Sequence, residues 1–463
     1  MLNNEGFSKG ARTTRRRRGM GLPGLLPAVF CLATAGHLWA SPPNILLIIA
    51  DDQGYGDFGF MGNPLVRTPH IDDLANRSAR FVNGYVPNSL CRPSLATLLT
   101  GLYPHQSGVT FNRPYFDLPH TLENRHRASY LVRRVDTLPR LLSRAGYRTL
   151  QTGKHWEGDF ANAGFDEGMT LARPHPIEKD PAFAKLGMKS GHGNGDAGLT
   201  IGRQTLQPIH DFVDRAAAEG KPFFVWYAPF LPHLPHNPPR RHLEPYAEDS
   251  RVPDHLAPYY ACITWLDETV GDLLGALRQR DLLRQTLVVF VVDNGYVVDP
   301  ENPNRSVRSK NTPFEQGIRT PILIGWEGQT SPGTHAGLVS TIDLAPTLLA
   351  AAGIGEAGTE LPGMDLMPVV RGRATLPPRP VFGEIYRGYA VELEQPEEEV
   401  LFRWVRWGNH KLILPEGSDE GAMLFDLTAD PNELNNLAGN PQLRSRRQEM
   451  ERLLDGWWNP RKQ

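Results

Sequence analysis

Three polar pairs follow predicted strands of this chain, and their side chains are suited to binding metals and anions. The pairs are Asp51 and Asp52 after residues 44–50, Lys154 and His155 after residues 147–153, and Asp293 and Asn294 after residues 286–292. The first and third pairs offer four oxygen donors, three of them anionic, which a hard cation such as Ca²⁺ or Mg²⁺ prefers. No cysteine and histidine cluster has zinc spacing. The sequence therefore predicts a Ca²⁺ or Mg²⁺ site.

Cys91 is a further candidate for chemistry. It lies in the run 88–101, shortly before Pro93 and Ser94. Because proline is favoured in the first turn of a helix, we expect Cys91 at a loop-to-helix junction, poised for modification or attack. With the carboxylates and the later Lys-His pair, this thiol suggests metal-assisted cleavage of an ester at an anionic centre.

The elements that must position these residues are buried strands and helices. The continuous apolar runs 44–50, 223–228 and 286–292 are typical of strands in a parallel sheet covered by helices on both faces. Ligands gather at the carboxyl ends of such strands. Helical patterns lie between the strands, at 68–75, 93–99, 137–145 and 259–277. The predicted class is therefore α/β, with a large, mostly parallel sheet flanked by helices.

The C-terminal part has a different pattern. A proline-rich stretch at 377–380 is followed by short alternating segments at 402–407 and 410–414, and a helix is predicted at 443–454. These features predict a small antiparallel sheet plus a helix. We expect a signal peptide at 1–40, a catalytic domain at 41–375 and a small α+β subdomain at 376–463.

The first forty residues resemble a secretory signal. Four arginines at 15–18 precede an apolar stretch from Gly19 to Trp39, which ends at Ala40 and Ser41. We expect an exported protein, periplasmic or extracellular. The alternative is an uncleaved membrane anchor, although two prolines and a histidine weaken a spanning helix. No later run is long enough to cross a bilayer, so no stable membrane partner is expected.

Charge and cysteine content exclude other classes. The chain has 463 residues and a formal net charge of −2, which argues against a general nucleic-acid binder. Of its three cysteines, Cys31 lies in the predicted signal, and Cys262 lies in an apolar helical stretch that predicts a core position. A disulfide between Cys91 and Cys262 is a minor alternative.

Several motifs, in order, make the chain resemble the type I sulfatases of the alkaline phosphatase superfamily. The resemblance runs from Asn44 nearly to the C-terminus. The matching segments are 44–56, 91–101, 153–154, 232–236, 293–295, 310–321 and 424–437. The resemblance implies hydrolysis of sulfate monoesters on a carbohydrate or aryl alcohol, so the implied partner is a sulfated small molecule or glycan.

The resemblance also implies a modification of Cys91. In that family a separate formylglycine-generating enzyme oxidises the signature cysteine to formylglycine. One hydroxyl of its hydrate attacks the sulfur of the ester and forms a covalent intermediate, and the second hydroxyl allows sulfate to leave. A Ca²⁺ or Mg²⁺ ion is held by the four oxygen donors described above, with the converted Cys91 as a further ligand.

Roles for the basic residues follow from the same resemblance. Lys154 and Lys310 would hold the sulfate oxygens and stabilise charge in the transition state. His233 would protonate the leaving oxygen, and His155 would act on the formylglycine hydroxyls. His236 is the rival to His233, because only geometry separates two histidines three residues apart.

Two positions depart from the family pattern. The family has arginine where this chain has Leu95, which shares a helix face with Cys91 and cannot support it by charge. Arg92 points about 100° away on an ideal helix and is a poor substitute. The family order Lys-Trp-His is replaced by Lys154, His155 and Trp156. These departures put conversion of Cys91 and the role of His155 in doubt.

Two other functions are therefore alternatives. One is a phosphatase or phosphonate hydrolase of the same superfamily, because the metal and lysines would serve either anion. The other is a catalytically impaired sulfatase-like protein that binds sulfated glycans. Specificity is expected in the loops 113–134, 174–203 and 296–309, whose arginines and histidines suit a polyanionic or sugar ligand.

Overall fold

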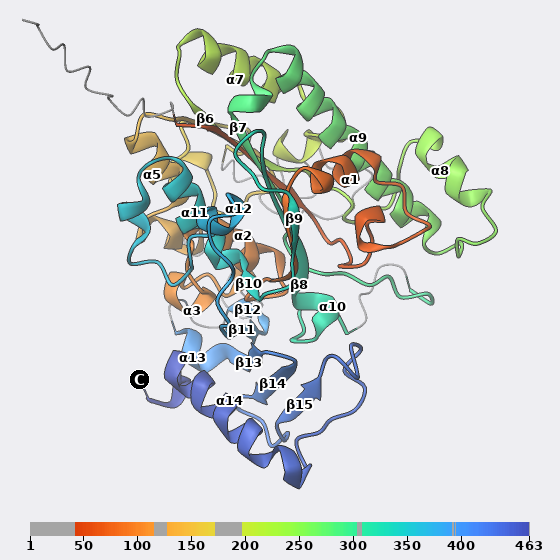
Figure 1. Cartoon of the computed structure of the whole chain (residues 1–463), viewed down its shortest axis with the longest axis vertical. Helices are drawn as coiled ribbons and strands as arrows, with labels where there is room; N and C mark the ends of the chain where they lie inside the picture. The colour runs from red at the N-terminus through yellow and green to blue at the C-terminus, as the bar shows by residue number, and fades with distance from the viewer. Residues whose placement is uncertain are drawn as a thin grey trace, which may run out of the picture. The chain divides into compact units, whose positions relative to one another are not determined.

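A nine-stranded sheet dominates the computed structural model (Figure 1), which describes residues 42–114, 127–171, 197–302, 308–390, 393 and 395–462. The order of its strands is β10-β2-β8-β7-β1-β6-β4-β5, with β9 paired to β2. The strands are β1 (Asn44–Ala50), β2 (Ala79–Tyr85), β4 (Arg148–Gly153), β5 (Glu167–Gly168), β6 (Phe223–Ala228), β7 (Thr286–Val292), β8 (Arg319–Trp326), β9 (Gly333–His335) and β10 (Val339–Ser340).

The predicted mostly parallel sheet is confirmed. β1 lies between β6 and β7 and is parallel to both, with Leu47 opposite Trp226 on one side and Val289 on the other. β8 is the exception, because it runs antiparallel to both of its neighbours, β2 and β7. The strands β1, β6 and β7 have the predicted bounds.

Helices cover both faces of the sheet, because alternate side chains of each buried strand point to opposite sides. Ile45, Leu47 and Ile49 belong to the hydrophobic cluster under α2 (Cys91–Thr100), α5 (Leu138–Arg144), α11 (Leu344–Ala351) and α12 (Met367–Val370). Leu46 and Ile48 belong to the cluster under α1 (Pro69–Asn76), α7 (Gln207–Ala218) and α9 (Ala257–Gln279). Figure 1 shows these two helical layers.

Helix α2 starts at Cys91, at the predicted junction. Leu90 before it is extended, with φ −128° and ψ 138°, and the helix ends at Gly101 in the left-handed conformation. The side chain of Asn112 accepts a hydrogen bond from the Arg92 amide at 2.9 Å, which satisfies one N–H group of the first turn. All ten residues of α2 are buried, so the position of Cys91 is held by the core.

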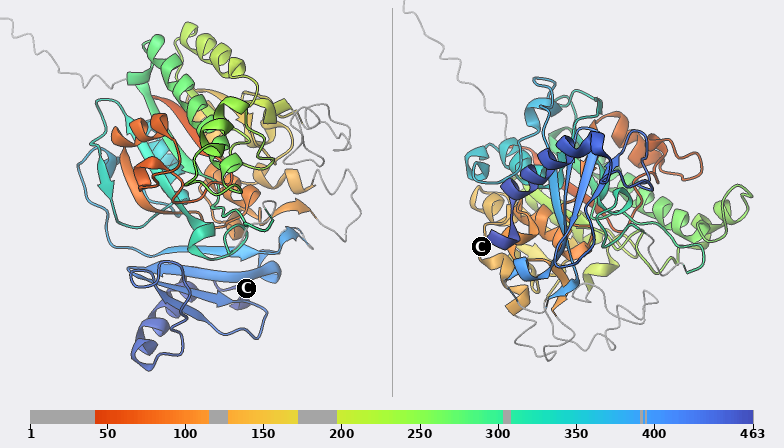
Figure 2. Two further views of the ribbon diagram at one scale, coloured as in Figure 1. Left: turned by 90° about the vertical axis from the view of Figure 1, so that its right-hand side faces the viewer. Right: turned by 90° about the horizontal axis from the view of Figure 1, so that it is seen from below.

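A second, four-stranded antiparallel sheet forms the C-terminal part, as predicted. Its order is β11 (Val381–Tyr386), β13 (Val400–Trp407), β14 (His410–Pro415) and β15 (Met423–Asp426). Met450 and Leu454 of α14 (Arg444–Trp457) pack on one face of this sheet, and Figure 2 shows α14 lying across the strands. Residues of the other face cluster with Tyr85 and Ile318 of the main part. The proposed boundary at 375 remains a prediction.

The remaining elements are short. They are α3 (Pro104–Ser107), α8 (Arg240–Ala247), α10 (Glu315–Ile318), α13 (Pro396–Glu399) and a parallel pair of strands, β3 (Phe111–Pro114) and β12 (Gly388–Ala390). Residues 1–41, including the predicted signal and Cys31, and parts of the three loops named above lie outside the described residues. None of the described helices has the length and apolar character needed to cross a bilayer.

Buried charges join the C-terminal sheet to the main part. The ammonium of Lys411 on β14 lies 3.2 Å from Glu315 of α10 and 2.5 Å from Glu433. The second oxygen of Glu433 accepts a hydrogen bond from the Glu315 amide at 2.6 Å, and Tyr85 donates to Glu315 at 2.8 Å. Removing one partner of a buried ion pair leaves an uncompensated charge, so this group makes docking of the sheet sensitive to single changes.

We expect Lys411→Met to lower the free energy of unfolding by about 3–5 kcal/mol, because the buried carboxylate of Glu433 loses its cation, whereas Glu315 keeps Arg406 at 3.4 Å. Urea unfolding measures this change. The matched control is Lys221→Met, since Lys221 is half exposed and lies 3.5 Å from Glu219. The control should change stability by less than about 0.5 kcal/mol. Equal effects of the two substitutions would contradict the importance of the buried group.

Candidate active site at the carboxyl ends of the strands

The predicted acidic residues meet where β1 and β7 end. Asp51 and Asp52 follow β1, and Asp293 and Asn294 follow its neighbour β7. Asp52 has a left-handed backbone with φ 58°, and its amide donates to Asp293 Oδ1 at 3.0 Å. The amide of Asn294 donates to the same oxygen at 2.7 Å, and its side-chain nitrogen donates to Asp52 Oδ1 at 2.7 Å. Two parallel strand ends thus bring together residues 241 positions apart.

Two lysines contact these carboxylates. Lys154, which follows β4, has its ammonium 2.5 Å from Asp51 Oδ1 and 3.5 Å from Asp293 Oδ2. Lys310 lies 2.7 and 2.6 Å from the two oxygens of Asp52. Lys154 is 1% exposed, although lysine is almost never buried without a partner. Both lysines are therefore part of the acidic group.

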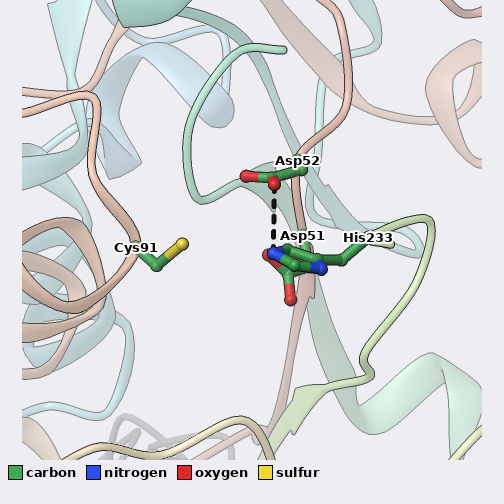
Figure 3. A group of neighbouring side chains, drawn as sticks. All are labelled: Asp51, Asp52, Cys91 and His233. Atoms are coloured by element: carbon green, nitrogen blue, oxygen red, sulfur yellow. Dashed lines mark ion pairs between the residues drawn. The ribbon is translucent and has the colours of Figure 1, made fainter. Parts of the chain in front are cut away.

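Cys91 faces this group across the site. Ligand atoms of Asp51, Asp52, Cys91 and His233 all lie within 4.8 Å of one another. Figure 3 shows the Cys91 sulfur pointing toward the carboxylates, and its dashed line joins Asp52 to His233. The cysteine backbone belongs to the core of α2, while its sulfur borders the polar site. Cys91 and Cys262 are both free thiols, and Cys262 is buried in the core, as predicted.

Unpartnered oxygens indicate how a cation would fit. Among the described residues, Asp51 Oδ2, Asp293 Oδ2 and Asn294 Oδ1 are buried and accept no hydrogen bond. Buried polar atoms without hydrogen-bond partners need an explanation, and a bound ion or water is one. Carboxylate and amide oxygens are the donors of a hard divalent cation. The donor set therefore fits a hard divalent cation.

Burial and mutual repulsion shape the pKa values of the acids. Burial raises the pKa of Asp51 well above its usual value, and burial likewise raises the pKa of Asp293. Burial acts in the same direction on Asp52, but Lys310 and Lys154 outweigh it and lower its pKa.

His233 is nearer to this group than its rival His236. Its Nε2 lies 3.2 Å from Asp52 Oδ2 and 3.4 Å from Lys310 Nζ, while its Nδ1 lies 2.7 Å from the Leu234 carbonyl oxygen. Burial and the two lysines hold the pKa of His233 well below its usual value. His236 instead lies against Tyr259, with ring centroids 5.3 Å apart.

His155 is held in a different environment. Its ring packs edge-on against Phe165, and burial lowers its pKa to about 3, with Arg92 as a further, smaller cause. Arg92 itself forms a buried two-pronged ion pair with Glu157 at 2.8 Å and lies 4.8 Å over the Phe111 ring. Arg92 is thus bound to Glu157, which agrees with its rejection as a substitute for the missing arginine. The role of His155 remains a prediction.

Comparison with known proteins decides the family. The family model described as Sulfatase matches residues 43–354, and the model of the N-sulphoglucosamine sulphohydrolase C-terminal region matches residues 307–458. The chain belongs to the sulfatase family. It is a sulfuric ester hydrolase by this membership, and the predicted resemblance is confirmed.

Relatives and solved structures agree with this assignment. Arylsulfatase A of Bos taurus is 33% identical over 87% of this chain and 85% of its own length. N-acetylgalactosamine-6-sulfatase of Canis lupus familiaris is 30% identical over 75% of this chain and 69% of its own length. The crystal structure of Ps i-CgsB has a TM-score of 0.70 at 26% identity, covering 90% of this chain and 93% of that one. The predicted fold class is confirmed.

We expect a divalent cation to stabilise this sulfatase, because the acidic group is assembled only in the folded chain. Ca²⁺ or Mg²⁺ at a hundred times its Kd should raise the free energy of unfolding by about 2.7 kcal/mol. Thermal unfolding at increasing concentrations of each ion measures this gain and ranks the two metals.

Asp293→Asn should remove most of that gain. The control is Asp267→Asn, because Asp267 is another buried carboxylate, which accepts hydrogen bonds from the amides of Ile71 and His70 and lies outside the acidic group. Asp267→Asn should lower the free energy of unfolding, but added Ca²⁺ or Mg²⁺ should still raise it by the same amount as in the unsubstituted protein. An equal response in both variants would contradict the assigned metal site.

Proposed function

We propose that this sulfatase hydrolyses sulfate monoesters of carbohydrate or aryl alcohols through Cys91 after its conversion to formylglycine. The observation that carries the proposal is the Cys91 sulfur within 4.8 Å of ligand atoms of Asp51, Asp52 and His233. Ps i-CgsB, which is 25% identical to this chain in its complex with k-i-k-neocarrahexaose, binds an oligosaccharide. That likeness, together with the names of the relatives, supports a sulfated glycan or aryl sulfate as substrate.

The residues of the site divide the chemistry among them. Asp51, Asp52, Asp293 and Asn294 would hold a divalent cation, with residue 91 as a further ligand. Such a cation, when bound, polarises a sulfate oxygen and favours the deprotonated nucleophile. Lys154 and Lys310, whose pKa values the surrounding carboxylates raise despite burial, stay charged and bind the remaining sulfate oxygens.

Proton transfer falls to histidine. His233 would protonate the leaving oxygen from Nε2, because its Nδ1 is engaged with the Leu234 carbonyl oxygen and Nε2 faces the cluster. His155 would act on the hydroxyls of residue 91, as the resemblance implies.

Cellular context is part of the proposal. A formylglycine-generating enzyme would convert Cys91 before or during export, and residues 1–40 would direct the protein to the periplasm or the extracellular space. Mass analysis of the Cys91 peptide, isolated from the native host, tests the conversion. An aldehyde supports the enzyme mechanism, whereas an unmodified thiol would favour the impaired glycan binder.

Cys91→Ala should lower kcat/KM for a chromogenic aryl sulfate at least about 10³-fold, because it removes the nucleophile. Cys262→Ala is the matched control, since Cys262 is an equally buried free thiol outside the acidic group, and it should keep nearly full activity. The matching aryl phosphate should be the poorer substrate. Faster phosphate than sulfate hydrolysis would instead identify a phosphatase.

A further inference from the structure

Arg203 is a buried cation whose hydrogen bonds all go to the segment 230–237, between β6 and α8. Its Nε donates to the Phe230 carbonyl oxygen at 2.6 Å, and its Nη1 donates to Asn237 Oδ1 at 2.7 Å. Its Nη2 donates to the carbonyl oxygens of His233 at 2.9 Å and Pro235 at 3.3 Å. One planar guanidinium thus binds both ends and the middle of the segment that carries His233.

No carboxylate of the described residues forms an ion pair with Arg203, which is 7% exposed. Its cation lies 5.4 Å from the Phe230 ring and 5.3 Å from the Trp265 ring. Burying a charge without an opposite charge is costly, and backbone carbonyls compensate only part of that cost. A hydrophobic residue would fill this space at lower cost, so the fixed geometry of the guanidinium fork is the property that arginine adds.

The same contacts determine where the His233 ring lies. The ring stacks on Phe230 with centroids 4.5 Å apart, and Arg203 binds the carbonyl oxygens of both residues. The ring Nδ1 is bound to the Leu234 carbonyl oxygen inside the same segment. The stacking on Phe230 and the Nδ1 contact therefore both lie within the segment that Arg203 binds, whereas Nε2 contacts Asp52 and Lys310 outside it.

We propose that Arg203 is a positioning residue that keeps His233 aligned to protonate the leaving oxygen. This inference rests on the proposed function, in which His233 is the general acid. A displacement of about 1 Å can cost two orders of magnitude in rate. Arg203 should therefore matter most when the leaving group needs a proton in the transition state.

Substituted phenyl sulfates provide the test. A nitrophenolate leaves without protonation, whereas an unsubstituted or methoxy-substituted phenolate is more basic and depends on the acid. Arg203→Lys should lower kcat/KM for 4-methoxyphenyl sulfate about 10²-fold and for 4-nitrophenyl sulfate less than about threefold, since general acid catalysis contributes about 10²–10⁴. The plot of log kcat/KM against leaving-group pKa should become steeper.

The matched control is Arg403→Lys in the C-terminal sheet. Arg403 is 3% exposed and binds Glu416 and the Trp458 carbonyl oxygen, far in sequence from the His233 segment. Arg403→Lys should lower the free energy of unfolding without changing the slope of log kcat/KM against leaving-group pKa. If Arg203→Lys does not fold, Asn237→Ala removes one acceptor of the guanidinium and should steepen the plot to a smaller extent.

Chemical rescue provides an independent measurement. A cavity of about 680 Å³ is lined by Arg203, Trp265 and Arg241, so a small cation can reach the space left by Arg203→Ala. Added guanidinium should restore turnover of 4-methoxyphenyl sulfate more than turnover of 4-nitrophenyl sulfate. Equal recovery of both substrates would contradict positioning of the acid.

His233→Gln separates this inference from the proposed function on which it rests. If His233→Gln leaves the slope unchanged, the assignment of the general acid is wrong. Suppose instead that His233→Gln steepens the plot of log kcat/KM against leaving-group pKa. If Arg203→Lys then lowers kcat/KM equally for all substrates, or leaves it unchanged, only the inference about Arg203 is wrong. In the His233→Gln background, Arg203→Lys should add no further steepening, because the two residues act through one proton transfer.

Discussion

Compensation of three buried carboxylates is the constraint on which this site depends. Asp51, Asp52 and Asp293 are each at most 3% exposed and lie within reach of one another. Such a group is tolerated only when cations balance it, because water cannot solvate the charges. Lys154 and Lys310 provide part of that balance. The oxygens of the same group that accept no hydrogen bond are suited to a divalent cation as well.

The parallel sheet makes this concentration of charge possible. Neighbouring parallel strands end at the same edge, so residues that follow β1 and β7 meet without long connecting structure. Helix α2 approaches from one face and brings Cys91 to the edge, while the segment after β6 brings His233. The C-terminal sheet adds support at a distance, since Glu433 binds the amide of Glu315 in the turn that follows the Lys310 loop.

Much of this arrangement could be predicted from particular residues. The uninterrupted apolar runs of β1, β6 and β7 identified buried strands, because a strand covered on both faces has no polar alternation. Pro93 indicated the start of α2 through its preference for the first turn of a helix. The antiparallel strand β8 was not foreseen, since direction is decided by connections and not by composition. The side chain of His155 packs against Phe165, and no local pattern indicates that.

The sequence by itself determined which chemical groups are present and that several of them follow buried strands, because those properties are local. Only the tertiary structure decided which of two nearby histidines faces the carboxylates, and that Arg92 binds Glu157. It also decided that Arg203 holds the segment carrying His233. These relations depend on the angles at which separate loops meet. Such angles arise from packing across the whole core, and no stretch of a few residues encodes them.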